Sequence, residues 1–276
     1  MRRRGSRLRE LIVIDQDQVL IKPSVNYINT TGISYGYSFR KLTLSSTYSL
    51  RQYKNDLSSF QDVGFIDGYI DTDSILSFAN GLSTTFELYD QISNVLKYTA
   101  YNSNPLPIIT SDNGSLIIRN NKLVGRFNSS RLSMKPVDSF PTKTICFHSF
   151  MSPESGISRM ISSFATIGGS FSWIGVMENG STSSAGGGFY YKNKTLISPI
   201  NRGILYNSYL DQSRVVSTIK NLTLNQDGTK HFIKGYNISS SFPYPEFFKE
   251  ELIYDENALT LTDISNIEDN MINLYN

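Results

Sequence analysis

Thr84-Thr-Phe-Glu-Leu-Tyr-Asp90 is the stretch that best reveals the fold, because apolar and polar residues alternate along it. Alternation with a period of two is typical of a β-strand that has one face in a core. Similar short runs follow, separated by turns rich in Gly, Asn, Ser and Pro. These runs begin at Ser115, Leu123, Thr144, Phe171, Phe189, Gly203, Arg214, His231 and Phe247. Many short strands joined by such turns predict an all-β sandwich.

Two segments depart from this pattern and predict helices. Asp71 and Thr72 form a capping signal ahead of apolar residues at helical spacing, so we expect one short helix near residues 71–79. Thr260-Leu-Thr-Asp263 has the form of a capping box and predicts a C-terminal helix. The expected apolar stripe of that helix consists of Ile264, Ile267, Met271 and Leu274.

Residues 1–31 show no amphipathic pattern long enough to fold alone, and we interpret them as an extended N-terminal arm. The sandwich is expected to occupy residues 32–276. The arm begins with a cluster of arginines, at positions Arg2, Arg3, Arg4, Arg7 and Arg9. The apolar run that follows the cluster, Leu11 to Ile14, is too short for an export signal or a membrane span, so no membrane insertion is expected.

Composition excludes several classes of function. The net charge of the 276 residues is only +2, so the chain lacks the concentrated positive charge with which proteins bind nucleic acids. Cys146 is the single cysteine, so no disulfide can form within the chain, and folding in a reducing cytoplasm is expected.

No metal or cofactor is expected. His148 and His231 are the only histidines, and they form no cluster with zinc spacing. Asp67, Asp71 and Asp73 could line a calcium loop, but a helix cap beside a solvated turn is the simpler interpretation.

Two stretches resemble a known family. Residues 32–94 include Gly32-Ile-Ser-Tyr-Gly-Tyr and the turn Tyr89-Asp90-Gln91-Ile92-Ser93. They resemble the N-terminal part of the α-L-arabinofuranosidase B catalytic domain, which also occurs in structural proteins of tailed bacteriophages. Residues 247–275 resemble the closing strand and helix of laminin G-like phage modules. The resemblance implies a concanavalin/laminin G-like jelly-roll sandwich.

The resemblance also raises the question of glycosidase chemistry, which in retaining enzymes requires two carboxyl groups. Met177-Glu178-Asn179-Gly180 resembles the segment that carries the nucleophile of the family, which makes Glu178 the candidate nucleophile. The family's acid/base aspartate has its best counterpart in Lys234-Gly-Tyr-Asn237, where the aspartate is absent. The cysteine pairs of the family are absent as well. On these grounds no catalysis is expected, and Glu178 is interpreted as a vestige.

The sequence therefore predicts a virion protein of a tailed bacteriophage, in the tail or a head fibre, whose sandwich binds host-surface glycan or decorates the particle. The arginines of the arm would attach it to other virion proteins, and we expect a homo-oligomer. The candidate carbohydrate-binding residues are Tyr89, Asp90, Trp173, Glu178, Asn179, Tyr236 and Asn237. The alternative is a glycoside hydrolase, similar to arabinofuranosidases, that acts on surface polysaccharide.

Overall fold

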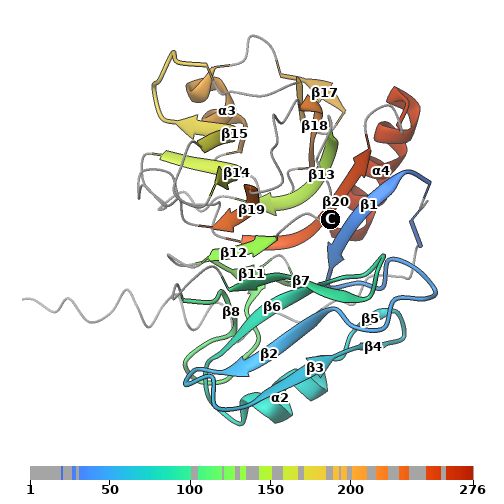
Figure 1. The fold of residues 1–276 in the computed structure, drawn as a ribbon, viewed down its shortest axis with the longest axis vertical. Coiled ribbons are helices and arrows are strands. Elements are labelled where there is room, and N and C mark those ends of the chain that lie inside the picture. The colour runs from blue at the N-terminus through green and yellow to red at the C-terminus, as the bar shows by residue number, and fades with distance from the viewer. Residues whose placement is uncertain are drawn as a thin grey trace, which may run out of the picture.

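The computed structural model of the chain is mostly β-sheet with few helices, as in an all-β sandwich (Figure 1). The structure describes residues 20, 27–28, 31–100, 105–119, 121–127, 131–134, 143–150, 158–166, 171–184, 189–192, 194–197, 201–209, 216–222, 230–235, 247–255 and 259–275.

The strands of the first half are β1 (Ile33–Ser38), β2 (Leu50–Lys54), β3 (Phe60–Val63), β4 (Phe65–Ile66), β5 (Tyr69–Ile70), β6 (Thr84–Asp90), β7 (Val95–Ala100), β8 (Ile108–Thr110), β9 (Ile118–Arg119), β10 (Lys122–Leu123), β11 (Gly125–Arg126) and β12 (Arg131–Met134). Those of the second half are β13 (Lys143–Phe150), β14 (Ser158–Thr166), β15 (Phe171–Glu178), β16 (Phe189–Lys192), β17 (Thr195–Leu196), β18 (Val216–Leu222), β19 (Lys230–Gly235) and β20 (Phe247–Asp255). The helices are α2 (Thr72–Ala79), α3 (Arg202–Tyr209) and α4 (Leu261–Tyr275).

Most strands belong to one hydrogen-bonded path, in the order β15-β14-β19-β12-β7-β6-β8-β11-β20-β13-β18-β16-β17. Two further branches extend it, because β1 pairs with β20, and β2 joins β6 to β3. The path curls on itself, so that distant strands share one core. Phe86 of β6, Leu132 of β12 and Ile253 of β20 all belong to the main hydrophobic cluster.

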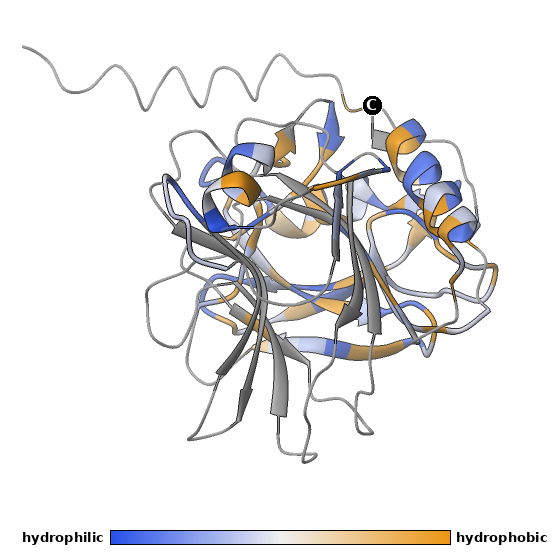
Figure 2. Ribbon diagram, turned by 90° about the horizontal axis from the view of Figure 1, so that it is seen from above, coloured by the Kyte–Doolittle hydropathy of each residue, from blue (hydrophilic) through white to orange (hydrophobic). Residues whose placement is uncertain are grey.

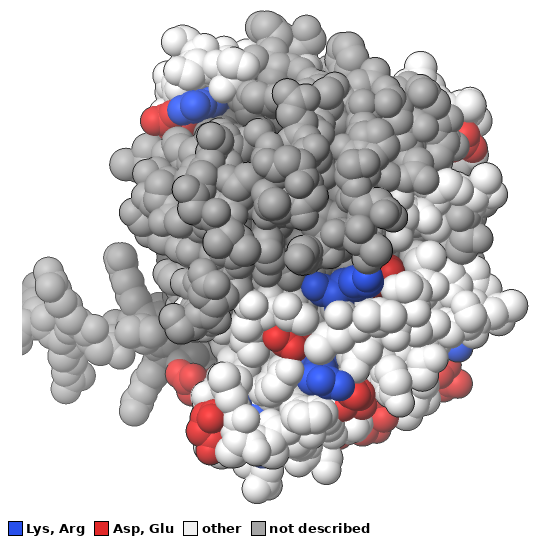
Figure 3. Space-filling model, in the orientation of Figure 1, with Lys and Arg blue, Asp and Glu red and all other residues white. Residues whose placement is uncertain are grey.

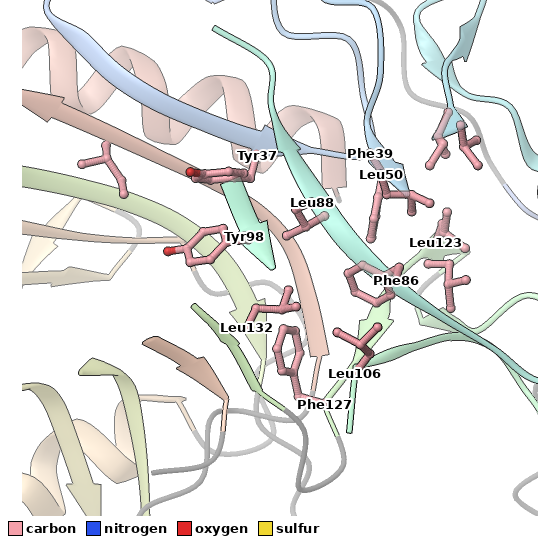
Figure 4. Packing of buried hydrophobic residues seen from close by; sticks show 14 of the residues in the cluster. Tyr37, Phe39, Leu50, Phe86, Leu88, Tyr98, Leu106, Leu123, Phe127 and Leu132 are labelled. Atoms are coloured by element: carbon pink, nitrogen blue, oxygen red, sulfur yellow. The ribbon is translucent and has the colours of Figure 1, made fainter. Parts of the chain in front are cut away.

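Aromatic rings fill the centre of this main cluster (Figure 4). Phe86 contacts Phe39 and Phe127 edge to face, with ring centroids 6.2 and 6.3 Å apart, and Tyr37 lies 4.4 Å from Tyr98. Edge-to-face packing at such distances stabilises aromatic cores beyond the burial of apolar area alone. Gly125 approaches the ring of Phe86 so closely that any side chain at this position would clash with it.

Helix α4 covers a second cluster beside β1 and β20 (Figure 1) and carries both apolar and polar residues along its length (Figure 2). Ile264, Met271 and Leu274 are buried there against Leu252 and Tyr254 of β20. The predicted C-terminal helix is therefore confirmed, and so is the predicted helix near residues 71–79, which is α2.

One expected strand is a helix. The run that begins at Gly203 was expected to be extended, but residues 202–209 form α3. Asn201 caps this helix, because its Oδ1 accepts a hydrogen bond of 2.8 Å from the backbone N–H of Ile204. Leu205 and Tyr206, which are adjacent in the helix, belong to the main hydrophobic cluster. A short apolar run fits a buried strand and a buried helix equally well, and here the cap decides between them.

The described residues of the N-terminal arm contact the sandwich. Leu20 packs against the main core, and the backbone N–H of Ile28 donates to the carbonyl of Leu42 over 3.0 Å. The arginines Arg2, Arg3, Arg4, Arg7 and Arg9 lie outside the described residues.

Candidate functional site

Glu178 is the last residue of β15, at the start of a tight turn. Asn179 and Gly180 form this turn, in which Gly180 has a φ of +71°, a conformation that glycine adopts without strain. The turn closes when the N–H of Ser181 donates to the carbonyl of Glu178 over 3.2 Å. The end of the strand therefore projects Glu178 beside an exposed loop, and Asn179 is exposed in that loop.

Helix α3 supplies the partner of Glu178. The Nη1 atom of Arg202 donates to Oε2 of Glu178 over 3.1 Å, with both side chains about one third exposed, at 28% and 32%. Arg202 is itself held in place, because its Nε donates to the carbonyl of Ser184 and its backbone N–H to the carbonyl of Ser183. A carboxylate at a strand end is thus given a fixed orientation while it remains accessible.

Close backbone packing brings α3 into this position. The N–H of Gly203 donates to the carbonyl of Ser181 over 2.8 Å, and a Cβ atom at Gly203 would lie only 2.8 Å from the same oxygen. Only glycine allows the first turn of α3 to approach the loop after β15 so closely. Glu178 was predicted from the sequence, but its partner Arg202 was not. The segment Asn201-Arg202-Gly203, which begins α3, is the sequence feature that could have indicated it.

Among the described residues, Asn179 lies beside Glu178 in the same turn, whereas Tyr89 and Asp90 lie on a distant strand. Trp173 pairs with Ser163 within the β15–β14 ladder. Tyr236 and Asn237 follow β19 directly but lie outside the described residues. Tyr89 and Asp90 belong to β6, which is separated from β15 by the strands β14, β19, β12 and β7.

Asp90, which the sequence predicted as a carbohydrate-binding residue, is buried in the structure. Asp90 is 0% exposed, and its carboxylate accepts hydrogen bonds from the backbone N–H groups of Gly36, Ile92 and Ser93. A carboxylate that is used in this way stabilises a turn and is closed to solvent.

Gln91, the next residue, is equally structural. Its Nε2 donates to the carbonyls of Ser38 and Arg40, and its Oε1 accepts from the N–H of Leu42. The Tyr-Asp-Gln turn that carries the family resemblance therefore joins β6 to the segment after β1. In this chain the Asp90 and Gln91 side chains of the turn hold the fold together.

Tyr89 lies at the surface edge of this turn. It is 7% exposed, its hydroxyl accepts a hydrogen bond of 3.0 Å from Nη2 of Arg51, and its ring centroid is 5.3 Å from that of Tyr48.

Within the described ranges, no group of three or more His, Cys, Asp or Glu side chains is arranged to hold a metal ion. Asp71 caps α2, since its side chain accepts from the N–H of Ser74 over 3.0 Å. No helix in the described part of the chain has the length and apolar character needed to cross a lipid bilayer.

Comparison of the fold with solved structures finds α-L-arabinofuranosidases of glycoside hydrolase family 54. One is a glutamate-to-glutamine mutant soaked with 4-nitrophenyl α-L-arabinofuranoside, and another was soaked with a cyclic sulfate inhibitor; each matches with a TM-score of 0.53. A third arabinofuranosidase, in complex with arabinofuranosyl-α-1,2-xylobiose, matches with a TM-score of 0.52. Each match has 9% sequence identity and covers 89% of this chain but 63% of the enzyme.

No protein-family model and no curated protein matches the sequence. At 9% identity, the likeness to the arabinofuranosidases shows a shared β-sandwich fold. The matched proteins are glycoside hydrolases, and this finding contradicts the expectation that the chain is not an enzyme. That expectation rested on the missing aspartate at the position of Asn237 and on the missing cysteine pairs.

Proposed function

We propose that this protein is a glycoside hydrolase that acts on α-L-arabinofuranosides or similar furanosides of a surface polysaccharide. The observation that carries the proposal is Glu178, which is held by Arg202 at the exposed end of β15 in a sandwich shared with arabinofuranosidases. We also propose that the sandwich is of the concanavalin/laminin G-like jelly-roll type.

Glu178 would act as the nucleophile of a retaining mechanism. In such enzymes a carboxylate attacks the anomeric carbon and forms a glycosyl-enzyme intermediate, while a second carboxyl group about 5 to 5.5 Å away protonates the leaving oxygen. Arg202 would act as a positioning residue, because it fixes the carboxylate in one orientation before substrate arrives. The carboxylates nearest in sequence to Asn237 are Asp227 and Glu246, and they are the first candidates for the acid/base.

The test uses 4-nitrophenyl α-L-arabinofuranoside, because 4-nitrophenolate departs without a proton and nucleophilic attack can then be measured independently of the acid/base. Release of 4-nitrophenolate by the full chain is expected to fall by roughly a thousandfold in Glu178→Gln. The matched control is Asp112→Asn, which neutralises an exposed carboxylate elsewhere and should leave the rate unchanged. Absence of release by the native chain, or equal rates with and without Glu178, would refute the proposal.

We further propose that residues 1–31 attach the protein to a tailed-phage particle through Arg2, Arg3, Arg4, Arg7 and Arg9, and that the substrate is host-surface glycan. The arginine cluster supports this location. Deletion of residues 1–19, which retains the packed residues Leu20 and Ile28, is expected to leave a folded protein that no longer joins the particle. Normal incorporation of the truncated chain would show that the arm has another role.

A further inference from the structure

A continuous row of aromatic and guanidinium groups lies along β2, β3 and β6. We call it the aromatic strip, and it consists of Tyr48, Arg51, Tyr53, Phe60 and Tyr89. The ring of Tyr48 lies 5.3 Å from that of Tyr89, and the Cζ atom of Arg51 lies 5.9 Å from the Tyr89 ring and 4.3 Å from the Phe60 ring. Phe60 in turn lies 5.8 Å from Tyr53. Each group of the strip therefore contacts the next.

Strand register puts the members of the strip that belong to strands on one face of the sheet, and the ring contact with Tyr89 places Tyr48 beside them. Arg51 lies opposite Asp62 on β3 and opposite Glu87 on β6, and Tyr53 lies opposite Phe60. Residues directly opposite each other in a ladder share a face. The intervening Leu50 and Gln52 are buried on the other face, where Gln52 donates to the carbonyl of Ile75 in α2. The strip is therefore on the face opposite to α2, where its ends, Phe60 and Tyr48, are exposed while Tyr53 and Tyr89 pack toward the interior.

Hydrogen bonds fix the polar members of the strip. Arg51 makes a two-pronged contact with Asp62, with Nε 2.6 Å from Oδ1 and Nη2 3.0 Å from Oδ2. The hydroxyl of Tyr53 donates to Oε2 of Glu87 over 2.7 Å, and Oε1 of the same carboxylate accepts from the N–H of Ala100. Such forked contacts hold a guanidinium group in one orientation. A ligand would meet a surface that is already ordered and would lose little entropy on binding.

The strip is accessible at both ends and carries no excess positive charge, because Glu87 adds a largely buried carboxylate to the Arg51–Asp62 pair. Phe60 is 55% exposed and Tyr48 is 37% exposed, while the side chains of Arg51 and Asp62 are about one quarter exposed. The positive charge of Arg51 is matched by the negative charge of Asp62. On the described part of the face in Figure 3, acidic and basic side chains form small groups within a largely uncharged surface. A surface of this kind suits an uncharged ligand better than a polyanion.

We propose that the aromatic strip binds a neutral polysaccharide, whose sugar rings stack on Phe60 and Tyr48 while their hydroxyl groups hydrogen-bond the Arg51–Asp62 pair. A sugar ring has an apolar face of C–H groups and an edge of hydroxyls, which matches exposed aromatic rings flanked by fixed donors and acceptors. The lack of excess positive charge argues against a polyanion and for a neutral chain, and the length of the strip along neighbouring strands argues for a polymer over a single sugar.

This surface is separate from the Glu178 site. Five strand-to-strand steps lead from β15 to β6, which corresponds to about 24 Å along the sheet. The register from strand to strand, through the pairing of Tyr98 with Leu88, also places Glu178 on the face that carries Leu132, opposite the face of Arg51. The strip would therefore hold a polysaccharide independently of catalysis, and binding can be tested even if Glu178 has no catalytic role.

The experiment measures migration of the full chain in native gels that contain soluble arabinan, arabinoxylan or dextran. All variants carry Glu178→Gln, so that no polymer is degraded. We expect retardation by at least one polysaccharide, with an association constant that falls about tenfold in Phe60→Ala and less in Tyr48→Ala. The control is Leu57→Ala, which removes an apolar side chain that is 58% exposed on the same surface turn and should change nothing. Retardation should persist at high salt, since no ion pair with the ligand is involved.

Two results would overturn the proposal. One is the absence of retardation with every polysaccharide, or retardation that Phe60→Ala leaves unchanged. The other is a change of self-association in Phe60→Ala, measured by sedimentation, without any change in retardation, which would identify the strip as a contact between copies of the chain. Hydrolysis is not needed for either result, so failure of the proposed enzymatic function is detected separately.

Discussion

Arg40 and Glu250 form an ion pair inside the protein, at 1% and 0% exposure. Nε and Nη2 of Arg40 bind the two carboxylate oxygens over 2.8 and 2.7 Å, and Ser38 Oγ donates to the same carboxylate. Removing one partner of such a pair leaves a buried charge without compensation. The pair therefore ties the segment after β1 to β20 at a position where loss of either charge is costly.

Replacing Glu250 with Gln is expected to lower the free energy of unfolding by about 3 to 5 kcal/mol, because the guanidinium of Arg40 stays buried and charged. The matched control is Asp62→Asn, which breaks the partly exposed pair with Arg51 and should cost no more than about 1 kcal/mol. Urea unfolding of both variants measures the difference. Equal losses would mean that the buried pair contributes no more than the surface pair.

Buried tyrosines make stability depend on alkaline pH. Burial, followed by the charges of Asp90 and Glu251, raises the pKa of Tyr37 well above its ordinary value, and burial with the hydrogen bond to Glu87 raises the pKa of Tyr53 to about 12. An unfolded tyrosine ionises near pH 10, so the stabilisation is complete below about pH 10 and is lost as pH rises through the folded values. Urea unfolding between about pH 8 and 12 should show this decline, which Tyr53→Phe should reduce. A constant stability over that range would contradict the assignment.

At the scale of elements, the stability of α2 depends on the hydrogen bond that caps its first turn. Asp71 accepts from the N–H of Ser74, and Asn80 ends the helix in the left-handed conformation at φ +48°. Asp71→Ala should lower the free energy of unfolding by about 1 kcal/mol through loss of the cap. Ser77→Ala, at an exposed position within the same helix, should be neutral or slightly stabilising. Thermal unfolding of the two variants tests the cap, and a larger loss in Ser77→Ala would contradict it.

Fewer residues of the predicted apolar stripe of α4 are fully buried in the second cluster than the sequence indicates. Ile264, Met271 and Leu274 are buried, whereas Ile267 is only partly buried. Glu268 is 0% exposed, although its charge places it outside the expected stripe. Burial on α4 therefore extends beyond the apolar stripe.

Ile264→Ala should cost about 2 to 5 kcal/mol, as for other buried isoleucines, and Ile267→Ala should cost less. Asn266→Ala, at an exposed position of the same helix, serves as the control and should change the urea midpoint little. Similar small effects of Ile264→Ala and Asn266→Ala would show that α4 is not docked on β20 in solution.

At the scale of the whole molecule, the main hydrophobic cluster joins the two halves of the chain. The main cluster includes Tyr37 and Phe86 from the first half, and Tyr190, Leu205 and Ile253 from the second. Elements that share one core are expected to unfold together.

We expect one cooperative unfolding transition, which can be followed with two probes. Fluorescence of Trp173, the single tryptophan, reports on the β15 end of the sheet path, and far-UV circular dichroism reports on the whole chain. Coincident transitions in urea are the expected outcome. Transitions that differ by more than experimental error would show that the β15 end unfolds as a separate unit.

Features that depend on nearby residues could be predicted from the sequence. The strand Thr84–Asp90, the cap of α2 and the capping box at Thr260 all arise from periodicity or from hydrogen bonds within a few positions, and the structure confirms each. Strands β2 and β3 escaped prediction, because Gln52 and Gln61 point toward α2 while the larger Tyr53 and Phe60 point outward. In most half-buried strands the apolar side chains point inward and the polar ones outward, and β2 and β3 reverse this arrangement.

By itself, the sequence determined that the protein is mostly β-sheet and where two of its helices lie. It also identified Glu178 as a candidate site residue. The tertiary structure alone decided which side chains are available for chemistry or binding. Arg202 reaches Glu178 across 24 positions, and Arg40 reaches Glu250 across 210. Asp90 is bound by the backbone N–H of Gly36 in β1, 54 positions away, and the aromatic strip joins residues from separate strands. No local pattern encodes such contacts, because they arise when the curled sheet brings distant strands together.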